Sequence, residues 1–411
     1  MAKIDDSVKK KVPELRFKGF TDDWEERKLI EVADYRNGKA HEKDISEAGD
    51  YIVVNSKFVS TNGLVKKYSD EMIAPLSKNE IAFVLSDVPN GRAIARTFLI
   101  SEENKYSLNQ RIAGITPHAD TNSYFLHSLM NRNHYFLRFD DGVSQTNLSK
   151  KEVEKWVELY PSYGEQQKIG SFFKQLDDTI ALHQHKLDLL KEQKKGYLQK
   201  MFPKNGKKVP ELRFAGFADD WEERKLGEIG SFKNGMNFGK DAMGHGSPFV
   251  NLQNIFGKNI VDDTTLELAE STEKQKVEYS LIKGDVLFIR SSVKPSGVGE
   301  AALVDSNLPD TTYSGFIIRF RPKIDIDNNF KRFVFGTKYV RNQIMARATS
   351  SANTNINQDS LSLIQVGLPN LKEQEKIGSF FKQLDDTIAL HQRKLDLLKE
   401  QKKGFLQKMF V

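Results

Sequence analysis

The strongest constraint on the fold of this chain is an internal repeat of two long segments. Residues 168–202 return at 376–410 with two changes in 35 residues, His185 to Arg393 and Tyr197 to Phe405. Residues 11–32 return at 208–229 with 18 of 22 residues unchanged. The residues between these segments do not repeat in this way. The chain is therefore predicted to form two equivalent halves, each with constant ends around a variable middle.

The spacing between the copies indicates where the two halves differ in length. The first constant segment repeats at an offset of 197 residues and the second at an offset of 208. Inside the variable middle, residues 78–84 resemble residues 283–289 at an offset of 205. The second half has therefore gained residues on both sides of this shared stretch. The two variable regions are predicted to share one fold with different loops, and loops on a fixed scaffold usually carry specificity.

Composition limits the class of protein. The hydrophobic fraction of 38% favours folded domains over disorder. No apolar run is long enough to span a membrane, and the N-terminus has no secretory signal pattern. Because the chain has no cysteine, disulfides and cysteine metal sites are excluded, and a cytoplasmic location is expected. The net charge of +6 is compatible with a nucleic-acid partner, although many basic proteins have none.

The second constant segment has the pattern of a coiled-coil helix. Its apolar residues follow a 4–3 spacing over more than four heptads, which indicates a seam that needs a partner helix. Since the chain carries two copies, we expect them to pair antiparallel. His183 and His391 lie in this seam, either as polar residues that fix register or as a pH-sensitive or metal site. The predicted seam residues are Ile169, Phe173, Leu176, Ile180, Leu187, Leu190, Ile377, Phe381, Leu384, Ile388, Leu395 and Leu398.

The variable regions show the pattern of mixed α+β structure. Short apolar runs predict strands at 81–85, 285–289 and 316–320, and helices are expected at 123–130 and 330–335. In the first constant segment, Asp22 is a candidate cap for a short helix ending near Leu29. Trp24 and its copy Trp221 are interpreted as core residues.

No catalytic signature is visible in the sequence. It lacks the Asn/Asp-Pro-Pro-aromatic motif of amino-methyltransferases, a phosphate-binding loop and a glycine-rich strand-to-helix turn. Its eight histidines show no metal-ligand spacing. These absences favour a binding protein over an enzyme.

Several repeated motifs together resemble the specificity subunit of a bacterial type I restriction-modification system. They are PELRF-x-GF-x-DDWEERKL, the stretch Thr146-Asn-Leu-Ser149, a following proline, Glu-Gln-x-Lys-Ile and the long heptad helix. The resemblance covers essentially the whole chain. It implies two target recognition domains, each reading one half of a bipartite site in double-stranded DNA, with the constant helices as spacer.

The same resemblance implies the partners. The constant helices would dock two copies of a methylation subunit, and restriction/translocase subunits would complete the assembly. Methyltransferase and endonuclease activities would belong to these separate chains. No cofactor is therefore expected in this chain, whereas AdoMet, ATP and Mg are expected on the partner subunits, and no membrane partner is expected.

The resulting domain prediction is an α+β fold with pseudo-two-fold symmetry. Two similar mixed α/β target recognition domains are separated by two long helices packed as an antiparallel coiled coil. The first recognition domain is placed at 1–160, the first constant helix and linker at 161–207, the second recognition domain at 208–368 and the second constant helix at 369–411.

DNA-contacting residues are predicted from residue type and loop position, because the family motifs do not identify them. Asn, Gln and Arg suit base edges, whereas Lys suits phosphates. The segment 290–297 is the strongest candidate because it is basic and differs from its counterpart at 85–91. The predicted set is Lys57, Asn62, Arg92, Arg96, Gln110, Arg111 and Gln145 in the first domain, and Asn251, Gln253, Asn254, Arg290, Ser291, Lys294 and Asn355 in the second.

Two other functions remain open from the sequence. The chain could be a coiled-coil scaffold or adaptor whose variable domains bind proteins. It could also be an enzyme with an unrecognised site. Steeply salt-dependent binding to specific duplex DNA would distinguish the first alternative, and binding of AdoMet or ATP by the isolated chain would support the second.

Overall fold

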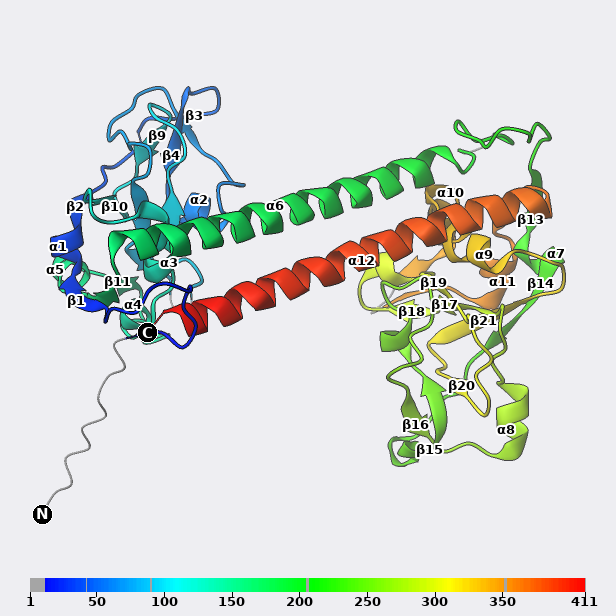
Figure 1. Cartoon of the computed structure of the whole chain (residues 1–411). Coiled ribbons are helices and arrows are strands. Elements are labelled where there is room, and N and C mark those ends of the chain that lie inside the picture. The colour runs from blue at the N-terminus through cyan, green and yellow to red at the C-terminus, as the bar shows by residue number, and fades with distance from the viewer. Residues whose placement is uncertain (1–11, 42, 89–90, 205–206, 351–352, 411) are drawn as a thin grey trace, which may run out of the picture. The chain divides into compact units, whose positions relative to one another are not determined.

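The structure, a computed structural model, describes residues 12–410 except 42, 89–90, 205–206 and 351–352. Residues 1–11 of the predicted first domain therefore lie outside the described residues. The chain divides into two compact units, Met1–Gln184 with Arg393–Val411, and His185–Gln392. Each unit holds one variable domain together with part of α6 (Tyr163–Lys200) and part of α12 (Leu371–Met409) (Figure 1).

The first unit is built on two four-stranded sheets and two short strand pairs. The central sheet has the order β2 (Ala33–Asn37), β10 (Ile112–Pro117), β6 (Ile81–Val84) and β8 (Thr97–Leu99). The second sheet has the order β3 (Ile45–Ser46), β5 (Tyr68–Ser69), β4 (Tyr51–Val54) and β9 (Tyr106–Leu108). The pairs are β1 (Glu25–Lys28) with β12 (Val157–Tyr160), and β7 (Ser86–Asp87) with β11 (Thr146–Asn147). Its short helices are α1 (Leu29–Val32), α2 (Ser56–Ser60), α3 (Ser123–Met130), α4 (His134–Leu137) and α5 (Lys150–Glu154).

The second unit repeats this plan with longer connections. Its central sheet has the order β14 (Gly230–Asn234), β21 (Ile317–Pro322), β17 (Val286–Ile289) and β19 (Ala301–Leu303). The other sheets contain β13 (Glu222–Lys225) with β24 (Gln365–Leu368), then β16 (Glu267–Ala269), β15 (Met243–Val250) and β20 (Thr312–Tyr313), then β18 (Ser291–Ser292), β23 (Thr354–Asn355) and β22 (Thr349–Ser350). Its shorter helices are α7 (Leu226–Ile229), η1 (Lys240–Ala242), η2 (Leu252–Asn254), α8 (Glu273–Glu278), η3 (Pro295–Gly297), α9 (Asn328–Val334), α10 (Lys338–Arg347) and α11 (Gln358–Ser362).

Strand register confirms that the two variable regions share one fold. In the central sheets, Gly114 lies opposite Arg36 and Arg319 lies opposite Lys233. These two pairs are related by the offsets of 205 and 197 found in the sequence. The pairs β1·β12 and β13·β24 also correspond residue for residue. The additional residues of the second half lie between the shared ladders, in stretches that also carry elements such as α8, and they leave those ladders in register.

The predicted elements of the variable regions are confirmed, but the helix predicted from Asp22 is wrong. The strands at 81–84, 286–289 and 317–322 and the helices α3 and α9 lie where the patterns placed them. Residues Glu25–Lys28, however, form strand β1, and the helix begins only at Leu29. The backbone of β1 pairs antiparallel with β12, and the paired residues are 129 to 135 positions apart in the sequence. This long-range pairing overrides a local capping pattern.

Each core contains the tryptophan of its constant segment and the first turns of its long helix. Trp24 packs with Ile169 and Phe173 in the first unit, and Trp221 packs with Ile377 and Phe381 in the second. Both tryptophans are 2% exposed, which confirms their assignment as core residues. The beginning of the predicted seam therefore serves as part of the domain core, and this contact fixes the long helix to the domain.

Ion pairs attach the constant segment to the same helices. In the first unit the guanidinium of Arg16 donates two hydrogen bonds to the carboxylate of Glu165, at 2.7 and 2.8 Å. Arg213 and Glu373 repeat both bonds in the second unit at the same distances. Each carboxylate side chain is almost fully buried. In both pairs the neighbouring carboxylate raises the pKa of the arginine.

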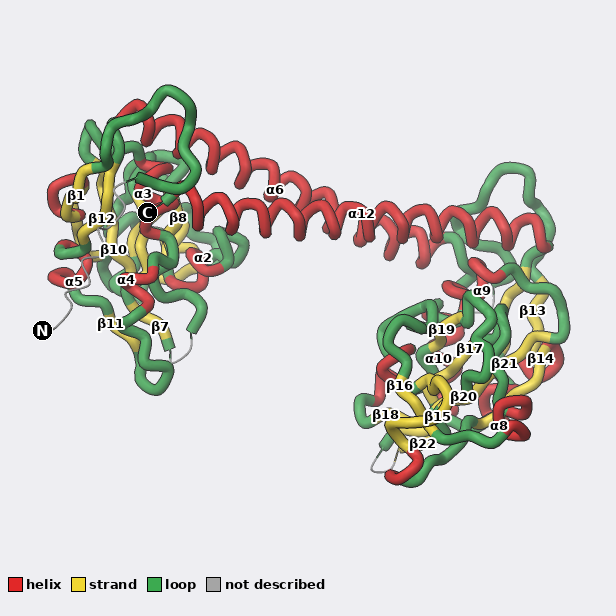
Figure 2. The backbone as a smooth tube through the Cα atoms, turned by 60° about the horizontal axis from the view of Figure 1, so that its bottom comes forward, coloured by secondary structure: helices red, strands yellow, loops and turns green. Residues whose placement is uncertain are grey.

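The long helices pair antiparallel within each unit. In the first, the ring of Phe172 contacts Phe405 at 5.0 Å, and Lys402 pairs with Asp177. In the second, Tyr197 contacts Phe380 at 5.1 Å, and Lys194 pairs with an aspartate of α12. Figure 2 shows uninterrupted helix along α6 and α12, and the strands lie outside these two helices. The predicted α+β class, with two similar mixed domains and two long helices, is confirmed.

Candidate nucleic-acid interface

A short antiparallel ribbon carries exposed polar side chains in the first domain. It consists of β7 and β11, with Asn147 opposite Ser86. Gln145 is exposed just before β11, and its amide donates a 2.7 Å hydrogen bond to the Ser86 hydroxyl. This bond orients the Gln145 amide at the surface, where an amide can both donate and accept hydrogen bonds.

The second domain carries the equivalent ribbon, β18 with β23 and β22. Ser291 lies opposite Asn355, in the same register as Ser86 and Asn147. Arg290 precedes the ribbon, and its guanidinium donates to the Gly315 carbonyl at 3.3 Å. Lys294 is exposed in the loop that leaves it. The structure therefore brings together the four predicted residues Arg290, Ser291, Lys294 and Asn355, although Ser291 itself is only 8% exposed.

Two other predicted segments of the first domain lie beside its ribbon. The turn with exposed Gln110 and Arg111 is adjacent, because the amide of Leu85 donates to the carbonyl of Arg111. Lys57 and Asn62 are exposed on or after α2, and α2 begins at Ser56, whose hydroxyl lies 3.5 Å from the Ser86 carbonyl.

Cationic side chains gather in the loop after β7. Arg92 is exposed and Arg96 is half-buried, with the Arg96 Nε donating to the Arg92 carbonyl at 2.5 Å. Burial, together with the nearby charges of Arg132 and Arg92, lowers the pKa of Arg96. Burial is the larger cause of this shift, and the two neighbouring guanidinium groups add to it. The proximity of Arg92, Arg96 and Arg132 makes this loop locally cationic, a setting that favours an anionic partner.

Three predicted residues of the second domain form hydrogen bonds that stabilise the loop around η2. Asn251 and Gln253 both donate to the carboxylate of Glu267, at 3.1 Å each. Asn254 is fully buried, and its amide donates to the carbonyls of Asp262 and Thr265. In this conformation the Asn254 side chain supports the loop, so a base contact would require the loop to open. No pattern in the sequence distinguishes this buried amide from an exposed one.

Sequence reasoning missed two exposed valines beside the ribbons. Val88 is 65% exposed and Val293 is 83% exposed. They occupy equivalent positions, each two residues after the ribbon serine, Ser86 or Ser291. The available signal was the shared Ser-x-Val pattern inside loops that otherwise differ.

The predicted seam is buried along both long helices. Ile169, Phe173, Leu187, Ile377, Phe381 and Leu395 are buried, and the six remaining predicted seam residues are half-buried. Two seam lysines, Lys194 and Lys402, form ion pairs with aspartates of the facing helix. Polar seam positions are thus used for charge pairing between helices.

The described part of the chain offers little for metal chemistry. Across residues 12–410, leaving out the short undescribed gaps, no three His, Asp or Glu side chains gather in a metal-binding arrangement. Among those same residues, no helix combines the length and apolar character needed to cross a membrane.

Known proteins show the same organisation. A family model of the type I restriction modification DNA specificity domain matches residues 21–192 and again residues 218–400. The chain is 26% identical over 199 residues to the putative type I restriction enzyme MjaX specificity subunit of Methanocaldococcus jannaschii, covering 47% of this chain and about half (46%) of that relative. It is 23% identical over 290 residues to the MjaVIII specificity subunit of the same organism, covering 69% of this chain and 68% of the relative.

Solved structures agree on the fold. The crystal structure of a type I restriction-modification S subunit from M. genitalium matches with a TM-score of 0.62 at 16% identity, covering 97% of this chain and 99% of that one. A structure concerning assembly and conformational transition of the type I R-M system matches with a TM-score of 0.55 at 15% identity, covering 95% and 98%. Because the family model matches most of the chain, once in each half, the protein belongs to the type I restriction modification DNA specificity family.

Proposed function

We propose that this chain is the non-catalytic specificity subunit of a type I restriction-modification complex and that each variable domain reads one half of a bipartite DNA site. The observation that carries this proposal is the repeated ribbon. The same strand register recurs in β7·β11 and β18·β23, while the loops around the two ribbons differ in sequence. Two unlike surfaces on one shared fold suit two unlike half-sites.

Genomic methylation mapping tests the proposal directly. With the chain present, we expect one bipartite modified sequence that disappears when the chain is deleted. Replacing residues 227–360 with the corresponding region of a relative should change one half-site and leave the other unchanged. A replacement that altered both half-sites would contradict the modular reading.

The exposed residues beside the ribbons are the proposed DNA contacts. Gln145 is exposed, whereas Asn355 is half-buried. Both carry amides, which suit adenine edges, and the exposed Lys57 and Lys294 suit phosphates. Replacing Gln145 with Ala should cost roughly 1–3 kcal/mol and relax specificity at one base pair. Replacing Lys294 with Ala should instead weaken binding to all sequences and reduce the salt slope by about 1. Equal effects of both changes on every sequence would remove the assignment of Gln145 as a base contact.

The two exposed valines suggest an apolar base contact. Val88 and Val293 present methyl groups beside the polar ribbon, and apolar side chains in the major groove contact the thymine methyl. Substituting deoxyuridine for thymine in a half-site should weaken binding by the wild-type complex. The same substitution should have a smaller effect on the variant Val293→Ala in the half-site read by the second domain, because alanine offers less apolar contact to the thymine methyl. An effect of equal size in both proteins would exclude this contact.

The long helices are proposed to set the spacing of the half-sites. Removing one heptad from the repeated segment of both helices would preserve their antiparallel register. We expect this change to shorten the non-contacted spacer and to leave both half-site sequences intact. Altered half-site preference in the mapped sequence would show that the helices do not define the spacing.

The catalytic steps are proposed to belong to partner subunits. AdoMet would then bind the methylation subunit, and ATP and Mg the restriction/translocase subunit, in keeping with a cytoplasmic assembly. Because the constant halves are nearly identical, two methylation subunits should bind each chain. Mass measurement of the saturated methylase complex tests this number, and a single bound copy would contradict it.

A further inference from the structure

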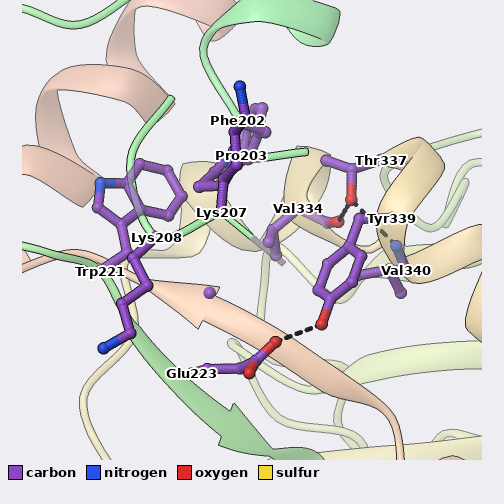
Figure 3. A pocket seen from close by; sticks show the side chains of 11 residues that line it. Phe202, Pro203, Lys207, Lys208, Trp221, Glu223, Val334, Thr337, Tyr339 and Val340 are labelled. Carbon is purple, nitrogen blue, oxygen red and sulfur yellow. Dashed lines mark hydrogen bonds between the residues drawn. The ribbon is translucent and has the colours of Figure 1, made fainter. Parts of the chain in front are cut away.

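Residues that read different bases should differ between the two domains while standing on the same backbone. The cavity beside Trp221 does not meet this condition, because part of its lining comes from the constant segments. Phe202, Trp221 and Glu223 line it, and all three recur unchanged in the first half, at positions 410, 24 and 26 (Figure 3). A difference in base preference must therefore come from the variable regions.

A short turn beside each ribbon does meet this condition. In the first domain it spans residues 109–111, between β9 and β10, and in the second it spans residues 314–316, between β20 and β21. The two turns correspond at the offset of 205 found in the sequence, and all three of their residues differ. The turn is thus an equivalent place in the fold that carries different side chains.

Backbone hydrogen bonds hold both turns in the same way. The first amide of the turn donates to a neighbouring strand, to the Val54 carbonyl at 3.1 Å in one domain and to the Val250 carbonyl at 3.0 Å in the other. The amide that follows the turn donates back to the carbonyl of its first residue, at 3.0 and 2.8 Å. The backbone of the turn is therefore placed alike in both domains.

The last residue of the turn lies at the base of the ribbon. The carbonyl of Arg111 accepts a hydrogen bond from the amide of Leu85 at 3.1 Å. In the second domain the carbonyl of Phe316 accepts from the amide of Arg290 at 2.7 Å. Leu85 and Arg290 each directly precede the first strand of their ribbon. A ligand on the ribbon would therefore meet the residue at 111 or 316 at an equivalent point.

A cation and an apolar side chain exchange places at this point. Arg111 is exposed in the first domain, and Phe316 is 53% exposed in the second. The adjacent residue changes in the opposite direction, since the buried Leu85 is replaced by the half-buried Arg290. Each domain therefore has one cation and one apolar residue at the base of its ribbon, but their positions are exchanged.

The exposed ring of Phe316 belongs to a wider apolar border of the second ribbon. A single exposed ring carries little meaning, but Val293 is also exposed, and Phe256 is 42% exposed. The Phe256 ring lies against the loop that leaves the ribbon, because a Cβ atom at Gly297 would be 2.6 Å from its Cε2. The exposed Lys294 lies in the same loop. Apolar groups with a cation beside them suit the base edges and phosphates of a duplex.

Arginine and phenylalanine suit different bases in the same groove. An arginine donates two hydrogen bonds to O6 and N7 of guanine, whereas a phenyl ring packs against the thymine methyl. Both features lie in the major groove, and the minor groove offers neither. Two equivalent turns that face the major groove can therefore read different base pairs through the side chain alone.

We propose that this position determines one base pair in each half-site, with Arg111 contacting a guanine and Phe316 contacting a thymine methyl. The inference rests on the proposed function and deepens it, because it names the base read at one position of each half-site. Since both side chains are exposed on a turn held by its backbone, their replacement should change base preference and leave the fold intact.

A modified guanine tests Arg111. The full-length chain is purified with its methylation subunit, and binding to the mapped bipartite site is measured with 7-deazaguanine at one guanine at a time. At one guanine of the first half-site the wild-type complex should lose about tenfold in affinity, because the N7 acceptor is missing. Arg111→Ala should bind the unmodified site more weakly and lose nothing further there. Lys78→Ala, an equal loss of charge at an exposed site before β6, should behave like wild type.

Deoxyuridine tests Phe316 in the second half-site. Replacing each thymine of either strand in turn removes one methyl group, and the wild-type complex should lose about fourfold in affinity at one position. Phe316→Ala should lose less at that position, because alanine offers less apolar contact. Ile282→Ala, which removes an exposed apolar side chain before β17, should keep the full loss. Thermal melts should show that all four variants are folded.

Several outcomes would overturn the inference. Equal sensitivity to 7-deazaguanine in wild type and Arg111→Ala would exclude the guanine contact. Uniform weakening by Arg111→Ala on every sequence, with a salt slope reduced by about 1, would assign Arg111 to a phosphate instead. Equal sensitivity to deoxyuridine in wild type and Phe316→Ala would exclude the methyl contact, as would a second half-site without an A·T pair. Absence of any sequence-specific binding by the wild-type complex would instead refute the proposed function.

Discussion

In each variable domain a buried carboxylate at the same position of the central sheet pairs with an arginine, but the arginine comes from a different strand. In the first domain, Glu80 accepts two hydrogen bonds from Arg36 on β2, at 2.8 and 3.0 Å. In the second, the equivalent carboxylate, Asp285, accepts two hydrogen bonds of 2.7 Å from Arg321 on β21. The strand register is identical in both sheets. The carboxylate that pairs with arginine therefore occupies the same position in both domains, whereas the arginine is supplied by β2 in one domain and by β21 in the other.

The ion pairs of the constant segments, in contrast, use the same residue types and the same geometry in both halves. Arg16–Glu165 and Arg213–Glu373 are the same pair with the same distances. Each ion pair of a variable domain joins residues of a single central sheet. The pair between the constant segment and the long helix joins two segments that are themselves repeated almost unchanged in the sequence.

The largest expected effect is loss of this constant pair. Glu165→Ala leaves the partly buried Arg16 without its carboxylate and Trp24 without its hydrogen-bond acceptor, which should destabilise the first unit by about 3 kcal/mol. Glu373→Ala should destabilise the second unit by a similar amount. Hydrogen exchange measured separately over the two units, with each variant as the control for the other, checks this equivalence. A much smaller cost in one unit would break it.

A steric change should distinguish the two central sheets. A Cβ atom at Gly114 would lie 2.2 Å from Oε1 of Glu80, which is held by both hydrogen bonds from Arg36. We expect Gly114→Ala to destabilise the first domain by about 1–3 kcal/mol. The equivalent residue is Arg319, so Arg319→Ala introduces no such clash. Equal thermal midpoints for wild type and Gly114→Ala would show that Glu80 can move away.

Acid should destabilise the first unit before the second. Burial, followed by the charge of Lys402, lowers the pKa of His127 to about 4, although Asp177 acts in the opposite direction. Between pH 6.5 and 4 the unfolded chain therefore binds a proton that the folded chain does not, and stability falls by roughly 3 kcal/mol as the pH falls through this range. The equivalent residue is Arg332, which does not titrate in this range. Unfolding measured from pH 7 to pH 4 should show this slope, and His127→Gln should abolish it.

The smallest expected difference concerns the two tryptophans. Nε1 of Trp24 donates to Glu165 at 3.3 Å, whereas Nε1 of Trp221 is buried without a hydrogen-bond partner among the described residues. Trp24→Phe should therefore cost about 0.5–1.5 kcal/mol more than Trp221→Phe. Urea unfolding of the two variants provides the comparison. An equal cost would mean that the long Trp24 bond contributes nothing.

The repeat made much of the fold predictable because it revealed register as well as architecture. The offsets found in sequence reappear as matched cross-strand pairs such as Gly114–Arg36 and Arg319–Lys233. Long apolar periodicity identified α6 and α12 for the same reason, since a heptad seam is a local signal. Residues 25–28 were assigned wrongly because their strand partner is distant in the sequence.

The candidate interface was less predictable because exposure depends on tertiary contacts. Gln145 and Asn254 are both amides in polar surroundings, yet one is exposed and the other holds two carbonyls inside a loop. Neither periodicity nor charge separates them. The predicted domain boundaries and DNA contacts therefore stay predictions, to be decided by the mapping and substitution experiments.

The pairing of β1 with β12, and of β13 with β24, has a consequence for how such domains change length. Each ladder joins the entry and the exit of its domain side by side. Residues can therefore be added between these two strands without moving the points at which the domain connects to the rest of the chain. The longer second domain illustrates this tolerance, since its ladder keeps the register of the first. Engineered exchange should therefore succeed when both cuts are made at this ladder, whatever the size of the incoming insert.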